Sequence, residues 1–168
     1  MDVGIGLDPQ ERRVVAIDLS GDKLELATRV GATHAVNAAD PRAIEQVRDI
    51  TSGGADYAIE MAGSTRAFEL AYRITRRGGT TVTAGLPNPS ATWAMPVVNL
   101  VGEERTIKGS YIGTCVPQRD VPRFVDLYRQ GRLPVNRLLS GRLPLEDVNL
   151  GFDRLREATA VRQIITFD

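Results

Sequence analysis

The sequence predicts an α/β protein built on a doubly wound parallel sheet. Short apolar runs alternate with stretches whose apolar residues recur at helical spacing, and Gly, Pro, Ser or Asn separate the two kinds of segment. Strands and helices that alternate in this way form parallel sheets, because right-handed crossovers place helices on both faces. A chain of 168 residues with 42% hydrophobic content can bury one substantial core, so we expect a single domain over residues 1–168.

The first half of the chain contains three strand–helix units in series. We expect the strands at 14–18, 35–37, 55–61 and 80–84, where apolar runs end near turn residues. The intervening helices begin near residues that suit a helix N-terminus, namely Ser20, Pro41 and Ser64. Glycines end these helices, and the pair Gly78 and Gly79 is expected to break the chain before the fourth strand.

The second half is less regular. Residues 86–94 are rich in Pro, Asn and Ser and predict a surface loop. An apolar run at 96–101 and a strand-like segment at 106–112 follow the loop. A helix at 121–128, a strand at 138–143, a helical apolar face from Leu145 to Leu155 and a closing strand at 163–167 complete the expected elements.

Charge and cysteine content limit the class of protein. The 21 basic residues balance the 21 acidic ones, so no general positive field attracts nucleic acid or an anionic membrane. No stretch is long and apolar enough to predict a membrane span or a secretory leader. The single Cys excludes an internal disulfide framework and favours the cytoplasm. We therefore expect neither a nucleic-acid nor a membrane partner.

Asp18 is the first candidate site residue. A carboxylate at the carboxyl end of a buried strand can accept hydrogen bonds from the ribose hydroxyls of a dinucleotide and repels a 2′-phosphate. Asp18 ends the run Val-Val-Ala-Ile-Asp, and Lys23 follows at the start of the next helix. Taken locally, the pair is equally compatible with a solvated Asp and Lys beside a turn.

Several short sequence runs of the chain resemble those of the zinc-type medium-chain alcohol dehydrogenases. The matching runs occur in the family's order over residues 14–168, and the likeness is closest to the class III-like branch that acts on ordinary alcohols or on thiol adducts of formaldehyde. The runs are Val-Val-Ala-Ile-Asp from 14, Lys-Leu-Glu-Leu-Ala from 23, Gly-Ala-Thr-His from 31, Gly-Ala-Asp-Tyr from 54, Glu-Met-Ala-Gly from 60, Gly-Gly at 78, Gly-Leu-Pro from 85, Lys-Gly-Ser-Tyr-Ile-Gly from 108, Gly-Phe-Asp from 151 and Val-Arg-Gln-Ile-Ile from 161.

The resemblance implies the NAD-binding, Rossmann-like domain of such an oxidoreductase and a set of cofactor contacts. Asp18 would select NAD through the ribose, and Lys23 would assist at the adenosine end. Small residues let the main chain approach a cofactor closely. The backbone of two short segments would border the nicotinamide half of NAD, and these segments contain Ala62, Gly63, Ala84, Gly85 and Leu86.

The resemblance also implies cofactor contacts for two further residues, Ile112 and Arg162. Ile112 would lie near the nicotinamide, with Tyr111 toward the substrate, and Arg162 would reach the pyrophosphate. Without the family, Ile112 is equally a core residue, Arg162 is one Arg among many, and the glycine segments at 62–63 and 84–86 are ordinary strand-end turns.

Residues 1–13 depart from the family pattern. A dinucleotide fold begins with a strand, a Gly-x-Gly-x-x-Gly turn and a crossover helix, whereas this chain offers only Gly4 and Gly6, of which Gly6 lies 12 residues before Asp18. The intervening segment is too short for a crossover helix. We therefore expect an N-terminally truncated domain without its first strand and glycine-rich turn. A gap or changed order in the sheet and weakened or lost NAD affinity follow from this loss.

No catalytic or metal residue is assigned. The resemblance implies that the family's catalytic zinc ligands belong to a preceding domain, which we expect this chain to lack. Tetrahedral zinc cannot be held by the usual nitrogen and sulfur ligands when the chain has one His and one Cys. His34 is interpreted as a surface or capping residue in a turn, and Cys115 as a loop or core thiol. We expect the chain to be catalytically incompetent unless another chain supplies the zinc domain.

Two other functions remain open at this stage. The resemblance implies edge strands that pair across a dimer axis in the segment from Pro96 to Ile112, so the chain could act as a nonenzymatic dimerising module or form a homodimer. A strand-end acid such as Asp18 also suits the ribose of S-adenosylmethionine in a methyltransferase-like domain. The Gly85 and Arg162 matches speak against the methyltransferase.

Overall fold

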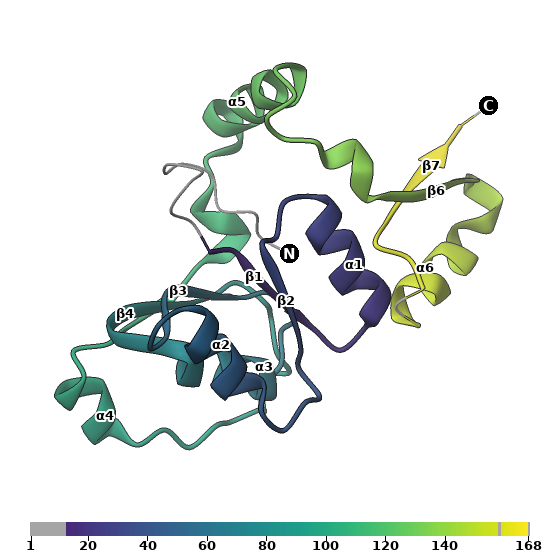
Figure 1. The fold of residues 1–168 in the computed structure, drawn as a ribbon. Helices are drawn as coiled ribbons and strands as arrows, with labels where there is room; N and C mark the ends of the chain where they lie inside the picture. The colour runs from purple at the N-terminus through teal and green to yellow at the C-terminus, as the bar shows by residue number, and fades with distance from the viewer. Residues whose placement is uncertain (1–12, 158, 168) are drawn as a thin grey trace. The chain divides into compact units, whose positions relative to one another are not determined.

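The computed structural model describes residues 13–157 and 159–167, so the Gly4 and Gly6 of the expected glycine remnant lie outside the described residues (Figure 1). The chain divides into two compact units, Met1–Cys115 and Val116–Asp168, and each is described here by itself. The expectation of one domain stays a prediction. No helix in the described ranges is long and apolar enough to cross a membrane.

The first unit repeats the strand–helix pattern that the sequence predicts. Each adjacent pair of strands within its sheets is parallel, as expected of a doubly wound fold. Its elements are β1 Val15–Asp18, α1 Gly21–Arg29, β2 His34–Asn37, α2 Ala43–Ile50, β3 Ala55–Glu60, α3 Thr65–Ile74, β4 Thr75–Thr83, α4 Val97–Gly102, β5 Thr106–Gly109 and the 3₁₀ segment η1 Tyr111–Thr114.

The parallel strands of this unit form two separate sheets. One has the order β1–β2 and the other the order β3–β4–β5. Among the described residues no strand joins β1 to β3. The α/β class with parallel strands is confirmed.

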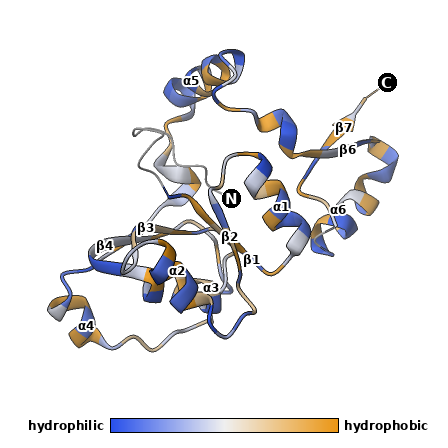
Figure 2. Ribbon diagram, viewed as in Figure 1, coloured by the Kyte–Doolittle hydropathy of each residue, from blue (hydrophilic) through white to orange (hydrophobic). Residues whose placement is uncertain are grey.

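One apolar core lies beneath both sheets. Helices α2 and α3 pack together and against β2, β3 and β4 (Figure 1). Figure 2 shows both hydrophobic and hydrophilic residues on α2 and α3, which is the amphipathic pattern such a position requires. The β1 residues Val15 and Ile17 pack against the buried cluster, whose members are Val36, Ala43, Val47, Ala58, Ala71 and Ile74.

Helix starts follow the polar residues that the sequence offers. The side-chain oxygen of Ser20 accepts from the N–H of Lys23 at 3.5 Å, and that of Ser64 accepts from the N–H of Ala67 at 3.1 Å. Each bond satisfies one of the N–H groups left unpaired at a helix start. The helix predicted after Pro41 begins at Ala43.

Two expected boundaries are wrong. β4 does not begin after the pair Gly78 and Gly79 but at Thr75, and its register against β3 shifts between the Ala55–Thr75 and Tyr57–Thr80 pairs. The glycines are accommodated by this irregularity, where Gly78 takes φ +68°, and do not end the strand.

The second correction concerns the expected edge strands from Pro96 to Ile112. Residues Val97–Gly102 form the helix α4, since Pro96 has a fixed φ of −68° and precedes an uninterrupted helical turn. Only Thr106–Gly109 is a strand, and η1 follows it. Within the described residues β5 pairs with β4 alone, so it remains an edge strand.

The second unit contains one parallel strand pair. Its elements are α5 Pro117–Arg129, η2 Val135–Leu138, β6 Leu139–Pro144, η3 Leu145–Asp147, α6 Val148–Arg156 and β7 Arg162–Thr166, and β6 pairs with β7. Gly151 of α6 lies against Leu143 of β6, and the Nε2 of Gln163 donates to the Gly151 carbonyl at 2.8 Å. These contacts fix α6 against β6 and β7.

Candidate cofactor site

The carboxyl ends of the strands in the first unit carry polar residues. In the parallel register, Asp18 at the end of β1 pairs with Asn37 of β2, and Glu60 at the end of β3 pairs with Thr83 of β4. Open α/β sheets bind ligands outside the carboxyl ends of their strands. The candidate site is therefore built from these ends and the turns that follow them.

Asp18 is half-buried and has acceptor capacity for a ligand. Its Oδ1 accepts a hydrogen bond from the Ser20 N–H at 2.9 Å, which orients the carboxylate toward the turn leading into α1. Its Oδ2 accepts no hydrogen bond from any of the residues described. The turn is also tied to β2, because the Nδ2 of Asn37 donates to the Leu19 carbonyl at 3.5 Å.

Lys23 lies in the first turn of α1 and is partly exposed. The nearby helix start orders this segment, since the Lys23 N–H donates to Ser20. Asp18 and Lys23 thus flank one short turn at the end of β1, as the sequence predicts. Whether the Lys23 ammonium serves a ligand stays a prediction.

The structure brings together the five residues expected at the nicotinamide half. The turn after β3, with Ala62 and Gly63, packs directly against the turn after β4, with Ala84, Gly85 and Leu86. A Cβ at Gly85 would lie 2.1 Å from the Gly63 nitrogen, which no real side chain tolerates.

Gly63 shows the same close approach from the other side. It takes φ +68°, a region that side chains disfavour, and a Cβ there would lie 2.9 Å from the Leu86 carbonyl oxygen. The Leu86 side chain is 77% exposed and offers apolar surface beside these two turns. The two turns therefore present main chain and one apolar side chain at the strand ends.

Glu60 and Thr83 are site residues to which the sequence analysis gave no role. Glu60 is buried, its Oε1 accepts from the Gly63 N–H at 2.6 Å, and its Oε2 accepts from the Thr83 hydroxyl at 2.7 Å. The sequence did contain a signal for Glu60, because it is an acid at the end of a strand and before a turn, as Asp18 is. Thr83 lies 23 residues further along the chain, and only the fold reveals it as a partner.

Ile112 follows β5 at the same edge. The Ser110 N–H donates to the Thr83 carbonyl at 2.9 Å, which ties the start of this segment to the end of β4. Ile112 takes φ 50° and is 66% exposed, so its interpretation as a core residue does not hold within the described chain. Its neighbour Tyr111 is exposed as well.

Arg162 begins β7 in the second unit and has an exposed side chain. Its N–H donates to the Ser140 hydroxyl at 3.3 Å. The contact of its guanidinium with a pyrophosphate stays a prediction.

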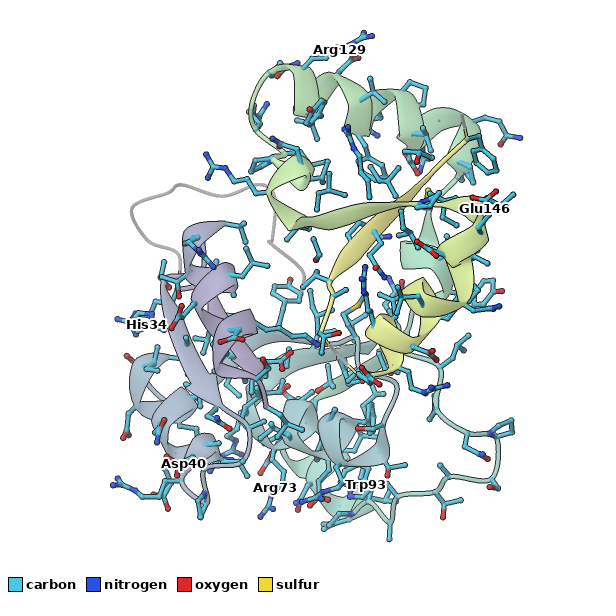
Figure 3. All side chains as sticks on the ribbon, turned by 90° about the vertical axis from the view of Figure 1, so that its right-hand side faces the viewer. His34, Asp40, Arg73, Trp93, Arg129 and Glu146 are labelled. Carbon is cyan, nitrogen blue, oxygen red and sulfur yellow. The ribbon has the colours of Figure 1, made fainter. Side chains whose placement is uncertain are left out.

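The loop between β4 and α4 is anchored by aromatic rings. Trp93 (labelled in Figure 3) lies in this loop. Its ring contacts those of Phe68 and Tyr72 on α3, with centroids 5.5 and 5.4 Å away. The guanidinium of Arg105 lies over the Tyr72 ring at 4.7 Å and also donates to the Tyr72 carbonyl. These contacts fix the far end of the loop that starts with Ala84.

The described chain offers no ligand set that fits zinc. No group of three or more His, Cys, Asp or Glu side chains comes together within the described ranges. His34 is exposed at the start of β2, where its Nδ1 lies 2.9 Å from the Thr33 hydroxyl (Figure 3). Cys115 is half-buried at the end of the first unit.

Two carboxylates outside the site have perturbed acidity. The pKa of Asp40 is lowered, first by the backbone N–H of Arg42 and then by the Gln46 amide. The pKa of Asp120 is held well below its usual range by the Arg119 guanidinium and the Val116 N–H. Hydrogen bonds to the ionised form cause both shifts.

Comparison with known proteins now identifies the family. The model of the zinc-binding dehydrogenase family matches residues 10–130, which is more than half of the chain. The chain belongs to this family. Alcohol dehydrogenase 1 of Hordeum vulgare is 31% identical over 159 residues, and the matched region covers 93% of this chain but 42% of that protein. This family member thus spans less than half the length of its curated relatives.

Solved structures of relatives have the same fold. The alcohol dehydrogenase zinc-binding domain protein from Burkholderia ambifaria superposes with a TM-score of 0.88 at 31% identity, covering 93% of this chain and 42% of that one. The benzyl alcohol dehydrogenase from Acinetobacter calcoaceticus gives a TM-score of 0.88 at 27% identity, with coverage of 93% and 43%. The resemblance to zinc-type alcohol dehydrogenases read from the sequence is confirmed.

Proposed function

We propose that this chain binds NAD at the carboxyl ends of its strands, as the dinucleotide-binding part of a dehydrogenase. The observation that carries the proposal is the state of Asp18. One of its oxygens is held by the Ser20 N–H at 2.9 Å, which leaves the other for a ribose hydroxyl. A carboxylate oriented in this way at the end of a parallel strand suits the adenosine ribose of NAD and repels the 2′-phosphate of NADP.

The remaining contacts follow from the two interlocked turns. The close approach of Gly63 and Gly85 leaves main chain exposed at the strand ends, and Leu86 and Ile112 add exposed apolar surface. Such a surface suits the nicotinamide half of the cofactor, with Lys23 assigned to the adenosine end. The bound NAD would supply the hydride-accepting ring of a dehydrogenase.

Among the described residues, binding rests on the adenosine contacts at the end of β1 and on the turns after β3 and β4.

We assign no alcohol oxidation to this chain by itself. The residues present do not fit a zinc site, because the sequence has one His and one Cys and no ligand group comes together among the described residues. Zinc chemistry would have to come from residues other than these. Zinc-dependent alcohol oxidation by the purified chain would contradict this part of the proposal.

The test is calorimetric titration of the purified chain with NAD, NADP and S-adenosylmethionine. We expect saturable NAD binding, at least tenfold weaker NADP binding, about 1.4 kcal/mol by the affinity relation, and no binding of S-adenosylmethionine. The variant Asp18→Ala should lose the NAD signal while its circular dichroism matches the wild type. A folded wild type that binds no NAD would refute the proposal, and binding of S-adenosylmethionine alone would favour the methyltransferase alternative.

A second candidate function, homodimer formation, is favoured by the edge of β5. Within the described residues this strand has no partner on one side, and α4 beside it in the chain exposes the apolar residues Val97, Val98 and Val101. Parallel or antiparallel addition of a second copy would cover the edge. Sedimentation over a range of concentrations tests it, because an unchanged monomer mass at high concentration contradicts a dimerising role.

A further inference from the structure

Glu60 is a buried carboxylate whose hydrogen bonds connect the turn after β3 with the end of β4 and the turn that follows it. The residue ends β3 and is 4% exposed. Its Oε1 accepts from the Gly63 N–H at 2.6 Å and its Oε2 from the Thr83 hydroxyl at 2.7 Å. Its main-chain carbonyl accepts from the Ala84 N–H at 2.9 Å. One residue therefore connects the turn after β3 with the turn after β4.

A carboxylate can be buried in this way only if hydrogen-bond donors surround it. A charged group removed from water is costly unless donors replace the lost hydration. Here both oxygens have short hydrogen bonds to donors, and no Lys, Arg or His forms an ion pair with Glu60 within the described chain. Glu60 is 4% exposed whereas Asp18 is half-buried, so we assign direct ligand binding to Asp18 and not to Glu60.

The two connected turns leave little room for adjustment. Because a Cβ at Gly85 would lie 2.1 Å from the Gly63 nitrogen, any shift of one turn must be matched by the other. Glu60 holds Gly63 through a side-chain oxygen and Ala84 through its carbonyl. The carboxylate holds the Gly63 main chain directly and the end of β4 through the Thr83 hydroxyl, and the residue as a whole connects both segments at the strand ends.

We propose that Glu60 is a positioning residue that sets these two turns for the nicotinamide half of NAD, with Thr83 as its partner. The inference rests on the proposed function, since it assigns a role within the NAD site. A positioning role and a general role in stability predict different effects on the two halves of NAD. Loss of the carboxylate should weaken binding of the nicotinamide half without affecting the adenosine half.

The experiment compares two ligands that occupy different parts of the site. AMP carries only the adenosine end, whereas NAD carries both ends, so the ratio of their affinities reports the nicotinamide half. Chemical-shift titration of the ¹⁵N-labelled chain gives both affinities and also records the Gly63 amide directly. The variant Glu60→Gln keeps the shape of the side chain and removes its charge. Thr83→Val removes the second donor and leaves Glu60 in place.

We expect each variant to lower NAD affinity about tenfold, the fold-change typical of one hydrogen bond to a charged group, and to leave AMP affinity within twofold. The Gly63 amide resonance should move upfield in Glu60→Gln, as its hydrogen bond to a carboxylate weakens. The matched control is Glu69→Gln on α3, a partly exposed glutamate whose Oε1 lies 3.4 Å from the Nη1 of Arg73. This control should leave both affinities unchanged.

Other results would overturn the proposal. Unchanged NAD affinity in both variants, or an equal loss of AMP and NAD affinity, would reduce Glu60 to a residue of general stability. If Glu60→Gln does not fold, Thr83→Val alone decides between these outcomes. A wild type that binds AMP but gains nothing from the nicotinamide half refutes the positioning role while the adenosine site stands. A wild type that binds neither ligand refutes the proposed function itself.

Discussion

The two sheets of the first unit end in two carboxylates with opposite environments. Asp18 ends β1 and Glu60 ends β3, and each precedes a turn leading toward a helix. Asp18 is half-buried, and its carboxylate accepts one hydrogen bond among the described residues, from the Ser20 N–H. Glu60 is buried, and both its oxygens have donors. The same residue chemistry at equivalent strand ends therefore supports ligand binding in one place and main-chain positioning in the other.

The packing around the two ends differs in the same sense. The turn after β1 is joined to the end of β2 by hydrogen bonds, from the Ala38 N–H to the Asp18 carbonyl at 3.0 Å and from Asn37 to the Leu19 carbonyl at 3.5 Å, and a Cβ at Gly21 would meet nothing within 4 Å. The turns after β3 and β4 are in such contact that Gly63 and Gly85 tolerate no side chain. Changes at the first end should therefore alter binding alone, whereas changes at the second should alter stability as well.

Gly85→Ala is the strongest test of this difference. The added methyl group would overlap the Gly63 main chain, which cannot move without the Leu86 main chain. We expect a loss of about 2–3 kcal/mol in the free energy of unfolding, as for overpacked sites that cannot relax. Urea denaturation measures it.

Gly102→Ala is the matched control for that variant. Gly102 ends α4 in the same unit, and a Cβ there meets nothing within 4 Å. Its free energy of unfolding should stay within about 0.5 kcal/mol of the wild type. Equal losses in the two variants would show that the interlocked turns have no special rigidity.

Asp18→Asn tests the other end. The amide oxygen can still accept from the Ser20 N–H, so the fold should be retained, whereas the charge that favours the ribose hydroxyls is removed. We expect NAD affinity to fall about tenfold and the preference for NAD over NADP to narrow. Calorimetric titration measures both. Asp22→Asn, a neighbouring acid in the first turn of α1, separates the local contact from the general loss of one negative charge.

The sequence predicts these two ends unequally. Asp18 follows an apolar run and precedes a serine cap, so both its strand and its position could be inferred locally. The family resemblance placed the backbone of Ala62, Gly63 and residues 84–86 beside the nicotinamide half of the cofactor, and the structure brings these residues together. The burial of Glu60 could not be inferred, because its partner Thr83 is 23 residues away and reaches it only through the β3–β4 register.

The region after β4 was predicted least well. The apolar residues 97–101 fit a strand and a helix equally, and periodicity alone does not distinguish such short runs. The helix α4 forms because Pro96 sets its start. The expected break at Gly78 and Gly79 failed for a related reason, since a parallel partner strand can accept an irregular register where the sequence indicates an end.

The serine caps of α1 and α3 sharpen the comparison with a smaller effect. Ser64 accepts from Ala67 at 3.1 Å, while the Ser20 bond to Lys23 is 3.5 Å long. We expect Ser64→Ala to cost about 1 kcal/mol and Ser20→Ala about 0.5 kcal/mol in the free energy of unfolding. Thermal and urea unfolding of both variants measure the difference. A larger loss at Ser20 would mean that the first end is the more tightly ordered one.

The smallest expected effect is a pH dependence on the β1–β2 side. Asp40 follows β2, and its pKa is lowered from the ordinary 3.8 by the Arg42 N–H and then by the Gln46 amide. A carboxylate with a lowered pKa in the folded state stabilises the fold above its ordinary value, and this contribution is lost as the pH falls below 3.8. The free energy of unfolding of Asp40→Asn should therefore be below that of the wild type at neutral pH and converge with it on acidification below pH 3.8. A difference that widened on acidification would contradict the hydrogen bonds assigned to the ionised Asp40 carboxylate beside the end of β2.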